Sequence, residues 1–454
     1  MSQWDEDSNT NNLRINLPPD EAKTLPETPE EAPEEALNNA LDKTPSRASE
    51  KTANKSTDKA TEEELKADPE EAQGGSVRPR DPVYYLEDVA GSTVLLAGGV
   101  LFKVIHLSLL APEPKPERYN NNACIKLLQD STTPTTGSGT SDEDAVVLPN
   151  IKAGQFRNLL LALLGRPGNP EYMALMSDAE YRSRHSQELF IRYLDIGTLA
   201  KSLKKENLLK WAESQLRPLL HTTSWRSEAK WDKELLLQTA AFGHSSDMQF
   251  SAEVLAFLLI ILTPTTKPPL YLETCISLFK DPRLSKDCPA LSGWIFSFIL
   301  AYGHRSTVWK ENLTREERLV LYAAQVELTK LSERPDLNTT WLINPRDPLD
   351  GLVNISCAEC RSHCEFVWRS SFGQVGKLDS AIPLEDIRNL MSLSQCRNRF
   401  AILLDSDYWP CVISCGEMIL PTADLYIWLL FRDMNNVYKQ LVECVPSHSS
   451  NNSS

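Results

Sequence analysis

The sequence lacks an excess of basic residues. Its 454 residues include 47 Lys and Arg against 62 Asp and Glu, which gives a formal net charge of −15. Binding to nucleic acid needs a basic surface that displaces counterions from phosphates, and docking on anionic lipid needs a similar surface. The charge balance therefore argues against a general nucleic-acid binder and against attachment to a membrane.

Long apolar runs are also missing. The longest are residues 254–262 and a stretch around 294–302, and both fall short of the roughly 20 residues that span a bilayer. The first seven residues, MSQWDED, have neither the basic start nor the apolar stretch of a signal peptide. We expect an intracellular protein, in the cytoplasm or the nucleus, whose apolar runs form buried helices.

The common catalytic and nucleotide-binding motifs do not occur. Gly137-Ser138-Gly139 lacks the third glycine of a dinucleotide fingerprint, and no Walker lysine is present. Neither Gly-x-Ser-x-Gly nor His-Glu-x-x-His is found. The sequence offers no catalytic residue, so we predict that the protein is not an enzyme.

The N-terminal segment is polar and acidic. Residues 1–80 hold 19 acidic and 10 basic side chains, and Trp4 is their one aromatic residue. Such a segment cannot bury enough apolar surface to offset its ordering entropy. We predict a disordered acidic tail over residues 1–79 and a short disordered tail over 446–454.

After residue 80 the composition favours a small sheet wrapped by helices. Residues 93–97 and 100–104 are β-type runs separated by Gly98-Gly99, which predicts a tight hairpin. A third strand is predicted at 145–148. Apolar residues then recur at helical spacing from Phe156 to Leu164, and two further helices around 196–203 and 208–219 should pack as an antiparallel pair.

From Trp225 onward the pattern is almost entirely helical. Apolar faces at helical spacing include Leu272/Cys275/Ile276/Phe279 and Leu319/Tyr322/Ala323/Val326. Thr314 and Glu317 have the spacing of a capping box, and a last helix is predicted from about Ala423 to Val442. The predicted fold class is α+β, with a small-sheet domain at 80–222 and a helical domain at 223–445.

Three stretches resemble the BTB/POZ family, in the divergent form found in many fungal proteins. The first is Glu87-Asp88-Val89 with the Gly-Gly hairpin and residues 101–111, similar to the family's strand, turn, F-x-V-H and helix ending in L-A. Here Ile105 stands between the F-x-V triplet and His106. The second is residues 139–150 followed by Phe156, similar to the family's V-x-L-P step into a helix. The third is residues 199–212, similar to the family's helix hairpin.

The resemblance implies a domain that associates with itself or with other proteins and has no chemistry of its own. Many family members recruit a cullin-type ubiquitin ligase scaffold. In the family the first strand and first helix build the dimer face, which falls here on Asp88, Phe102, Val104, His106, Leu107 and Leu110. From the residues alone, Asp88 could equally cap a turn, and the apolar residues could equally be ordinary core, because a buried dimer face and a core look alike in sequence.

A cluster of cysteines offers one candidate metal site. In Cys357-Ala358-Glu359-Cys360 two thiolates could share a tight turn, as tetrahedral zinc needs, with Cys364 or His363 as a third ligand. Cys411 and Cys415 would supply the second half. The alternative is a helix over 357–368 that places Cys357, Cys360, Cys364 and Trp368 on one apolar stripe. We favour the helix because core cysteines far outnumber split zinc sites, so no cofactor is expected.

These patterns together predict a protein-interaction adaptor. It would associate as a homodimer or heterodimer through its BTB-like domain and could serve as a substrate adaptor for a cullin ubiquitin ligase. One alternative is a zinc-binding regulator or enzyme with its site around Cys357–Cys415. Another is a helical scaffold that carries a degenerate BTB domain.

Overall fold

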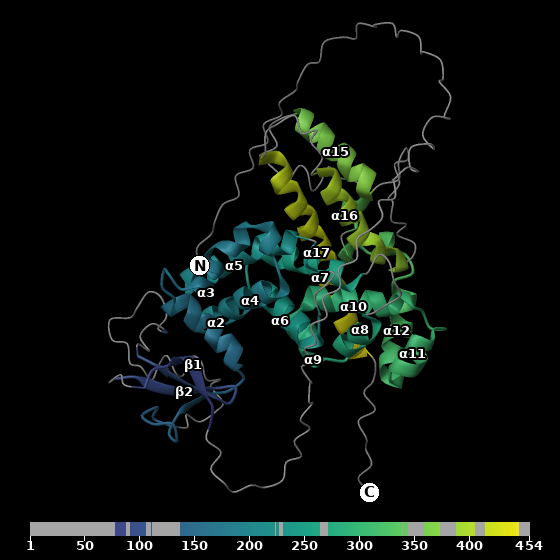
Figure 1. Ribbon diagram of the computed structural model, residues 1–454. Helices are drawn as coiled ribbons and strands as arrows, with labels where there is room; N and C mark the ends of the chain where they lie inside the picture. Colours follow the sequence, from purple (N-terminus) through teal and green to yellow (C-terminus); the bar gives the residue numbers. More distant parts are fainter. Residues whose placement is uncertain are drawn as a thin grey trace, which may run out of the picture. The chain divides into compact units, whose positions relative to one another are not determined.

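The structure of the chain is a computed structural model, which describes part of the sequence. The described residues are 78–87, 91–105, 110, 137–222, 224–226, 230–263, 271–337, 339–343, 358–372, 387–404 and 414–444. The chain divides into two units, Met1–Gly74 and Gly75–Ser454, and every described residue belongs to the second. Most of its elements are helices, and they accompany a single described sheet (Figure 1). The predicted combination of a small sheet with a largely helical chain is therefore confirmed.

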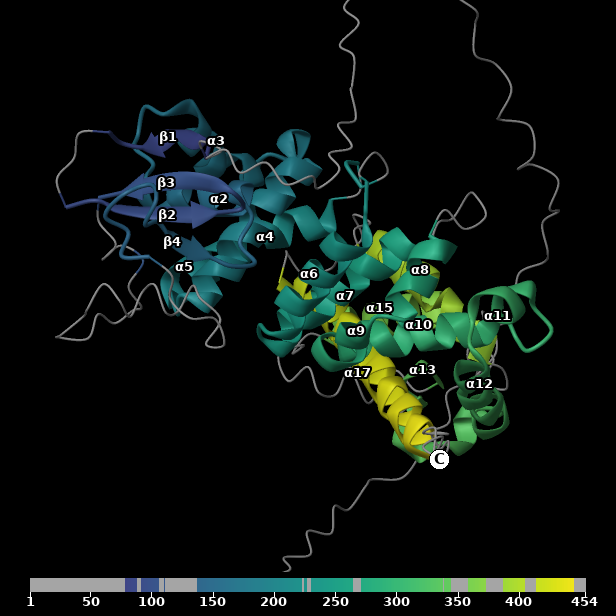
Figure 2. The ribbon, with the colours of Figure 1, turned by 90° about the horizontal axis from the view of Figure 1, so that it is seen from below.

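The sheet has four strands in the order β1-β3-β2-β4 (Figure 2). The strands are β1 (Arg80–Tyr85), β2 (Thr93–Ala97), β3 (Val100–Val104) and β4 (Val146–Leu148). β2 and β3 are antiparallel, whereas β1 runs parallel to β3 and β4 runs parallel to β2. The predicted hairpin and the predicted third strand are both present, and β1 is a strand that we did not predict.

The two glycines of the hairpin are required by its geometry. Gly98 has a φ of +53° and Gly99 a φ of +81°, a left-handed conformation that a two-residue hairpin turn needs and that other residues rarely adopt. A Cβ on Gly98 would also lie 2.6 Å from the backbone nitrogen of Ala153. The turn therefore fits closely against the start of the following helix, and this contact brings the sheet and the helix together.

Helix α2 (Ala153–Leu164) covers the sheet through its predicted apolar face. Phe156 lies edge-to-face with Phe102 of β3, with the ring centroids 5.0 Å apart. Leu159 and Leu160 belong to the same buried cluster as Leu95 of β2. The predicted packing of this helix on the hairpin is confirmed.

The remaining elements are short 3-10 turns and helices. The helices, in chain order, are α3 (Pro170–Ser177), α4 (Gln187–Ser202), α5 (Glu206–His221), α6 (Lys233–His244), α7 (Met248–Leu262), α8 (Leu272–Phe279), α9 (Pro282–Asp287), α10 (Pro289–Ala301), α11 (Thr307–Asn312), α12 (Arg315–Glu327), α13 (Thr340–Ile343), α15 (Ala358–Phe372), α16 (Leu393–Leu404) and α17 (Ser414–Cys444). The 3-10 turns are η2 (Asp178–Glu180), η3 (Arg182–Arg184), η4 (Leu331–Glu333), η5 (Pro335–Leu337) and η6 (Ile387–Ser392). Among the described helices, none has both the length and the apolar composition to cross a membrane.

One buried core joins the predicted sheet domain to the predicted helical domain. It runs from Leu161 in α2 to Val437 in α17. At its centre Phe190 of α4 contacts Trp225, Trp231 and Phe257, with ring centroids 5.3 to 5.7 Å apart. Trp225 and Trp231 lie in the link between α5 and α6 and anchor it in this cluster. The helices before and after the link therefore pack around one common core.

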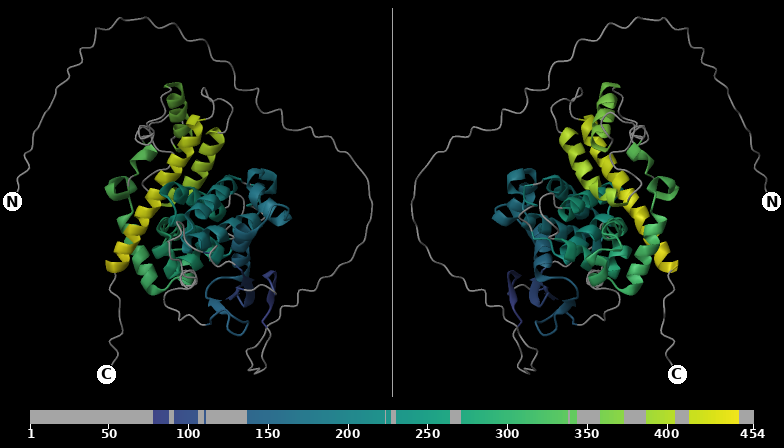
Figure 3. Two further views of the ribbon diagram at one scale, coloured as in Figure 1. Left: turned by 90° about the vertical axis from the view of Figure 1, so that its left-hand side faces the viewer. Right: turned by 90° about the vertical axis from the view of Figure 1, so that its right-hand side faces the viewer.

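Helix α17, drawn in yellow in Figure 3, is the longest described helix. It packs against α10. It begins at Ser414, nine residues before the predicted start at Ala423, and continues through Pro421. At Gly293 the two backbones meet so closely that an added Cβ would lie 1.7 Å from the carbonyl oxygen of Phe431. Glycine at this position is therefore a condition of the α10–α17 contact.

Helix α12 forms as predicted but buries a different face. The capping box is present, because Thr314 Oγ1 accepts from the Glu317 backbone and the Glu317 carboxylate accepts from the Thr314 backbone. The buried residues are Val320, Leu321 and Ala324. The predicted apolar face around Leu319 and Val326 lies instead on the surface.

Asp281 ties α6 to α9, and its charge should make stability depend on pH. Its carboxylate accepts from the Arg283 side chain and from Lys233 Nζ, at 2.8 to 3.1 Å, and these partners hold its pKa well below the usual range. Folding lowers the pKa of Asp281, so the ionised carboxylate stabilises the folded state. This contribution to the free energy of unfolding is complete above the unfolded pKa of about 3.9, and it is lost as the pH falls through the folded pKa.

We expect Asp281→Asn, which keeps the helix cap and removes the charge, to lower the free energy of unfolding by about 2 kcal/mol at pH 7. The difference from wild type should narrow steadily below pH 4. Urea unfolding at pH 7, 4 and 2.5 would measure it. An equal difference at all three pH values would contradict the ion-pair explanation.

Candidate functional site

A groove opens in the sheet-containing part of the chain. Its volume is about 1150 Å³. Four elements line it, namely β1, α2, the start of α3 and α4, through Val83, Tyr84, Gly154, Arg157, Asn158, Leu161, Gly168, Asn169, Pro170, Glu171, Gln187, Glu188, Ile191 and Arg192. Pockets for small molecules usually measure about 300–1,000 Å³, so this groove has room for a segment of polypeptide.

The wall between β1 and α2 is held by a buried carboxylate. The side chain of Asp81 has no exposed surface, and its Oδ2 accepts from Arg157 Nε at 2.9 Å and from Nη2 at 2.6 Å. Its Oδ1 accepts from the backbone nitrogens of Val83 and Tyr84. Asp81 therefore fixes Arg157 at the groove while leaving 43% of the arginine side chain exposed to solvent.

The opposite wall begins at the N-terminus of α3. Asn169 caps this helix by accepting from the backbone nitrogens of Glu171 and Tyr172, and Pro170 occupies the first turn.

Tyr84 of β1 is a half-buried phenol in the groove lining. Burial, followed by the charges of Glu171 and Asp81, raises the pKa of Tyr84 to about 12. Tyr84 therefore stays a neutral phenol that can donate a hydrogen bond at physiological pH.

Helix α4 supplies the third side of the groove. Arg192 Nη2 lies 2.6 Å from Glu188 Oε1, one helical turn away. Gln187 holds the helix start in place, since it donates to the backbone oxygen of Lys230 and accepts from the Lys230 backbone nitrogen. Helix α4 thus brings charges of both signs, Arg192 and Glu188, to the groove, and the hydrogen bonds of Gln187 hold the start of this helix in position.

Behind the groove a second buried carboxylate connects it to the helical region. Asp195 accepts from Asn158 Nδ2 at 3.0 Å and from Gln238 Nε2 at 3.2 Å. Burial raises the pKa of Asp195. Because these contacts join α2, α4 and α6, the shape of the groove depends on the packing of all three helices.

The groove lining combines apolar and charged side chains. Its lining residues include no Ser, Thr, Cys or His, and its arginines are engaged with neighbouring carboxylates. An exposed valine, a half-buried tyrosine and an isoleucine give it apolar surface beside the charges. Such a mixture resembles the apolar centre and polar rim of protein–protein interfaces.

Three of the residues predicted for the dimer face, Phe102, Val104 and Leu110, are described, and none of these three lines the groove. Phe102, Val104 and Leu110 have 0 to 3% of their surface exposed and belong to the core between the sheet and α2. In the structure they are core residues, the alternative that the sequence left open. Asp88, His106 and Leu107 lie outside the described residues.

The predicted zinc ligands are only partly described. Cys360 and Cys364 lie on α15 and are fully buried, as is Trp368, so these three occupy the apolar stripe that the helical alternative proposed. Cys357 and Cys411 lie outside the described residues, and Cys415 lies in the first turn of α17. Within the described ranges, no three His, Cys, Asp or Glu side chains are grouped so that they could hold a metal ion.

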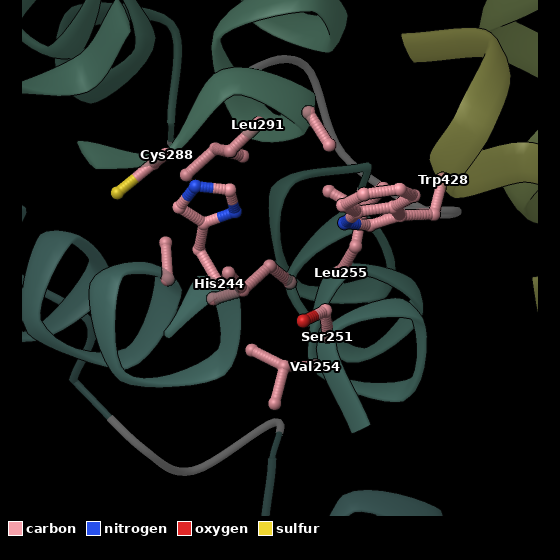
Figure 4. Close-up of a pocket in the computed structure, with 10 residues that line it drawn as sticks. His244, Ser251, Val254, Leu255, Cys288, Leu291 and Trp428 are labelled. Carbon is pink, nitrogen blue, oxygen red and sulfur yellow. The ribbon is translucent and has the colours of Figure 1, made fainter. Parts of the chain in front are cut away.

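A second, much smaller cavity brings a histidine, a cysteine and a serine together (Figure 4). Its volume is about 20 Å³, enough for one water molecule. Burial raises the pKa of the Cys288 thiol to about 12, so the thiol stays protonated. Ser251 Oγ donates to the backbone oxygens of Gly243 and Asp247. Neither group is activated as a nucleophile, and the cavity is a feature of the packing around His244.

None of the groove-lining residues was predicted from the sequence to be functional. They come from four separate elements, and they form no motif along the chain. One local pattern could have indicated an edge of the site, because Asn169-Pro170-Glu171 has the cap, proline and acidic residue of a helix start. Comparison of the chain with protein-family models, curated proteins and solved structures finds no match.

Proposed function

We propose that this protein is an interaction adaptor that holds a partner polypeptide in the groove between β1, α2, α3 and α4. The observation that carries the proposal is the groove itself, an open volume of about 1150 Å³ with apolar surface and charges of both signs. A partner segment would place an apolar side chain against Val83 and Ile191 and polar groups against Arg157 and Glu171.

The residues that resemble the BTB/POZ family support this proposal. The three stretches correspond to the β2–β3 hairpin, to β4 with the following α2, and to the α4–α5 helix pair. Residues from all three, including Phe102, Phe156 and Leu199, meet in one buried cluster. Recruitment of a cullin scaffold stays a prediction from the resemblance.

We expect a single charge in the groove to weaken partner capture. Val83 is 56% exposed, so Val83→Asp should fold normally while it places an unpaired carboxylate against the partner's apolar anchor. Loss of a central apolar contact typically weakens an interface by tenfold or more, so we expect about a tenfold lower recovery of bound proteins. Affinity purification of the tagged full-length chain with quantitative mass spectrometry would measure it.

The matched control is Ile402→Asp. Ile402 lies on α16 and is 72% exposed, so this variant adds the same charge away from the groove. It should recover the same proteins as wild type. If wild type and Val83→Asp recover the same proteins in equal amounts, the groove is not the binding site. If wild type recovers nothing above a tag-only control, the adaptor function is wrong.

A further inference from the structure

Arg226 is a buried cation with two unsatisfied nitrogens. It lies in the link between α5 and α6, and 8% of its surface is exposed. Its Nη2 donates to the backbone oxygen of Leu220, and its guanidinium carbon lies 4.9 Å from the centroid of the Phe257 ring. Its Nε and Nη1 are buried and have no hydrogen-bond partner among the residues that the structure describes. Burial, followed by the charge of Arg397, lowers the pKa of Arg226 to about 9, so the guanidinium is charged at pH 7.

A structural role at the end of α5 accounts for one nitrogen of Arg226. Trp225 Nε1 donates to the backbone oxygen of Leu219 at 3.3 Å, and Arg226 Nη2 donates to that of Leu220. These contacts cap the last carbonyls of α5, where a cation is also favoured by the helix dipole. A buried donor without an acceptor costs free energy, and the cost is larger for a charged group. An anion that accepts from Nε and Nη1 would remove this cost.

More arginines gather at the same end of α5, around His221. Four of them act on His221 through their charges, namely Arg182, Arg217, Arg226 and Arg397. Arg217 lies one helical turn before His221 on the same face of α5. Desolvation, followed by these charges, lowers the pKa of His221 to about 4. The imidazole is therefore neutral at pH 7, and one of its ring nitrogens carries a hydrogen that it can donate.

Two of the four arginines have carboxylate partners and two do not. Arg217 and Arg397 each lie 2.7 Å from an oxygen of a buried carboxylate. Arg182 and Arg226 form no ion pair with any residue in the described part of the chain. Arg182 lies in the 3-10 turn η3 and is exposed to solvent. The end of α5 therefore carries two uncompensated positive charges, one buried and one at the surface.

We propose that Arg226, Arg182 and His221 bind a phosphate group at the end of α5, as inorganic phosphate or as a phosphate monoester. A phosphate monoester carries a charge of about −1.5 to −2 at pH 7, which matches the two uncompensated arginines. Arg226 Nε and Nη1 would donate to its oxygens, and the neutral imidazole would donate a further hydrogen bond. Arginine suits this ligand because its planar guanidinium presents several donors to one phosphate. We call this place the Arg226 site, and it is separate from the groove.

Isothermal titration calorimetry of the full-length chain tests the proposal, with inorganic phosphate and methyl phosphate as probes. We expect at least one of them to bind once per chain. Arg226→Met should weaken binding by about 30-fold, because it removes charged hydrogen bonds. It should fold like wild type, since an apolar side chain of similar length replaces an unpaired buried charge, and circular dichroism would check this. Arg182→Met changes an exposed side chain and should weaken binding about two- to fivefold.

The matched control is Arg305→Met, which removes an exposed arginine between α10 and α11 and should bind phosphate like wild type. The two probes distinguish the sources: binding of inorganic phosphate alone assigns the site to the free ion, and binding of methyl phosphate assigns it to a monoester. Two results would overturn the proposal, namely no binding of either probe at millimolar concentration, or equal binding by wild type and Arg226→Met. Failure here is independent of the groove, since Val83→Asp should bind phosphate like wild type.

Discussion

Replacement of Gly293 by alanine should destabilise the protein by at least about 4 kcal/mol, or prevent folding altogether. The alanine Cβ would lie 1.7 Å from the Phe431 carbonyl oxygen, 2.8 Å from the Phe431 carbonyl carbon and 2.9 Å from the Asn435 backbone nitrogen. These are backbone atoms of α17, so no side-chain rotation can relieve the overlap. The two helices would have to separate along the most extensive helix contact of the described structure.

Urea unfolding followed by far-ultraviolet circular dichroism would measure this loss. Gly154→Ala is the matched control, because Gly154 also lies in a helix and no atom is found within 4 Å of its added Cβ. That substitution should raise stability by about 0.5–1 kcal/mol, since alanine favours the helix. A Gly293→Ala variant within 1 kcal/mol of wild type would show that α10 and α17 do not pack as described.

We expect removal of either partner of the buried ion pair between α16 and α17 to cost about 3–5 kcal/mol. Arg397 donates to both oxygens of Asp424, with both donor–acceptor distances at 2.7 Å. The arginine side chain is 9% exposed and the aspartate side chain is not exposed at all. Arg397→Met would leave the Asp424 carboxylate buried without its partner, and the loss of that pairing is the source of the large effect.

The double variant Arg397→Met with Asp424→Leu distinguishes two free energies. One is the cost of leaving a single charge buried without a partner, and the other is the net contribution of the ion pair to stability. With both charges gone, the remaining side chains can pack as apolar neighbours, so we expect much of the stability to return. The coupling is read from a double-mutant cycle of urea unfolding free energies. If the double variant loses the full sum of the two single effects, the pair is not coupled and the explanation is wrong.

Much of the local structure followed from short sequence patterns. Gly98-Gly99 between two β-type runs specifies a hairpin because few other residues adopt its turn conformation. The apolar spacing of Phe156 to Leu164 specifies a helix with one buried face, and the Thr314–Glu317 pair specifies where α12 begins. In each of these cases the physical cause lies within one or two helical turns of the chain.

Other features depend on contacts between distant residues and could not be predicted in the same way. β1 contains Pro82 and a buried aspartate, which argue against a strand, yet Asp81 is satisfied by Arg157 at a distance of 76 residues. Helix α12 has two apolar faces, Leu319/Tyr322/Val326 and Val320/Leu321/Ala324, and only tertiary packing decides which one is buried. The groove likewise exists only after four separate elements assemble.

The aromatic cluster around Trp225 and Trp231 has a practical consequence for dissecting the molecule. A fragment that ends at residue 222 would leave Phe190 without Trp225, Trp231 and Phe257, which normally surround it. It would also leave Asp195 without the amide of Gln238, behind the groove. Residues 80–222 expressed alone should therefore be partly unfolded and prone to aggregation. Screens for binding partners are better run with the full-length chain as bait.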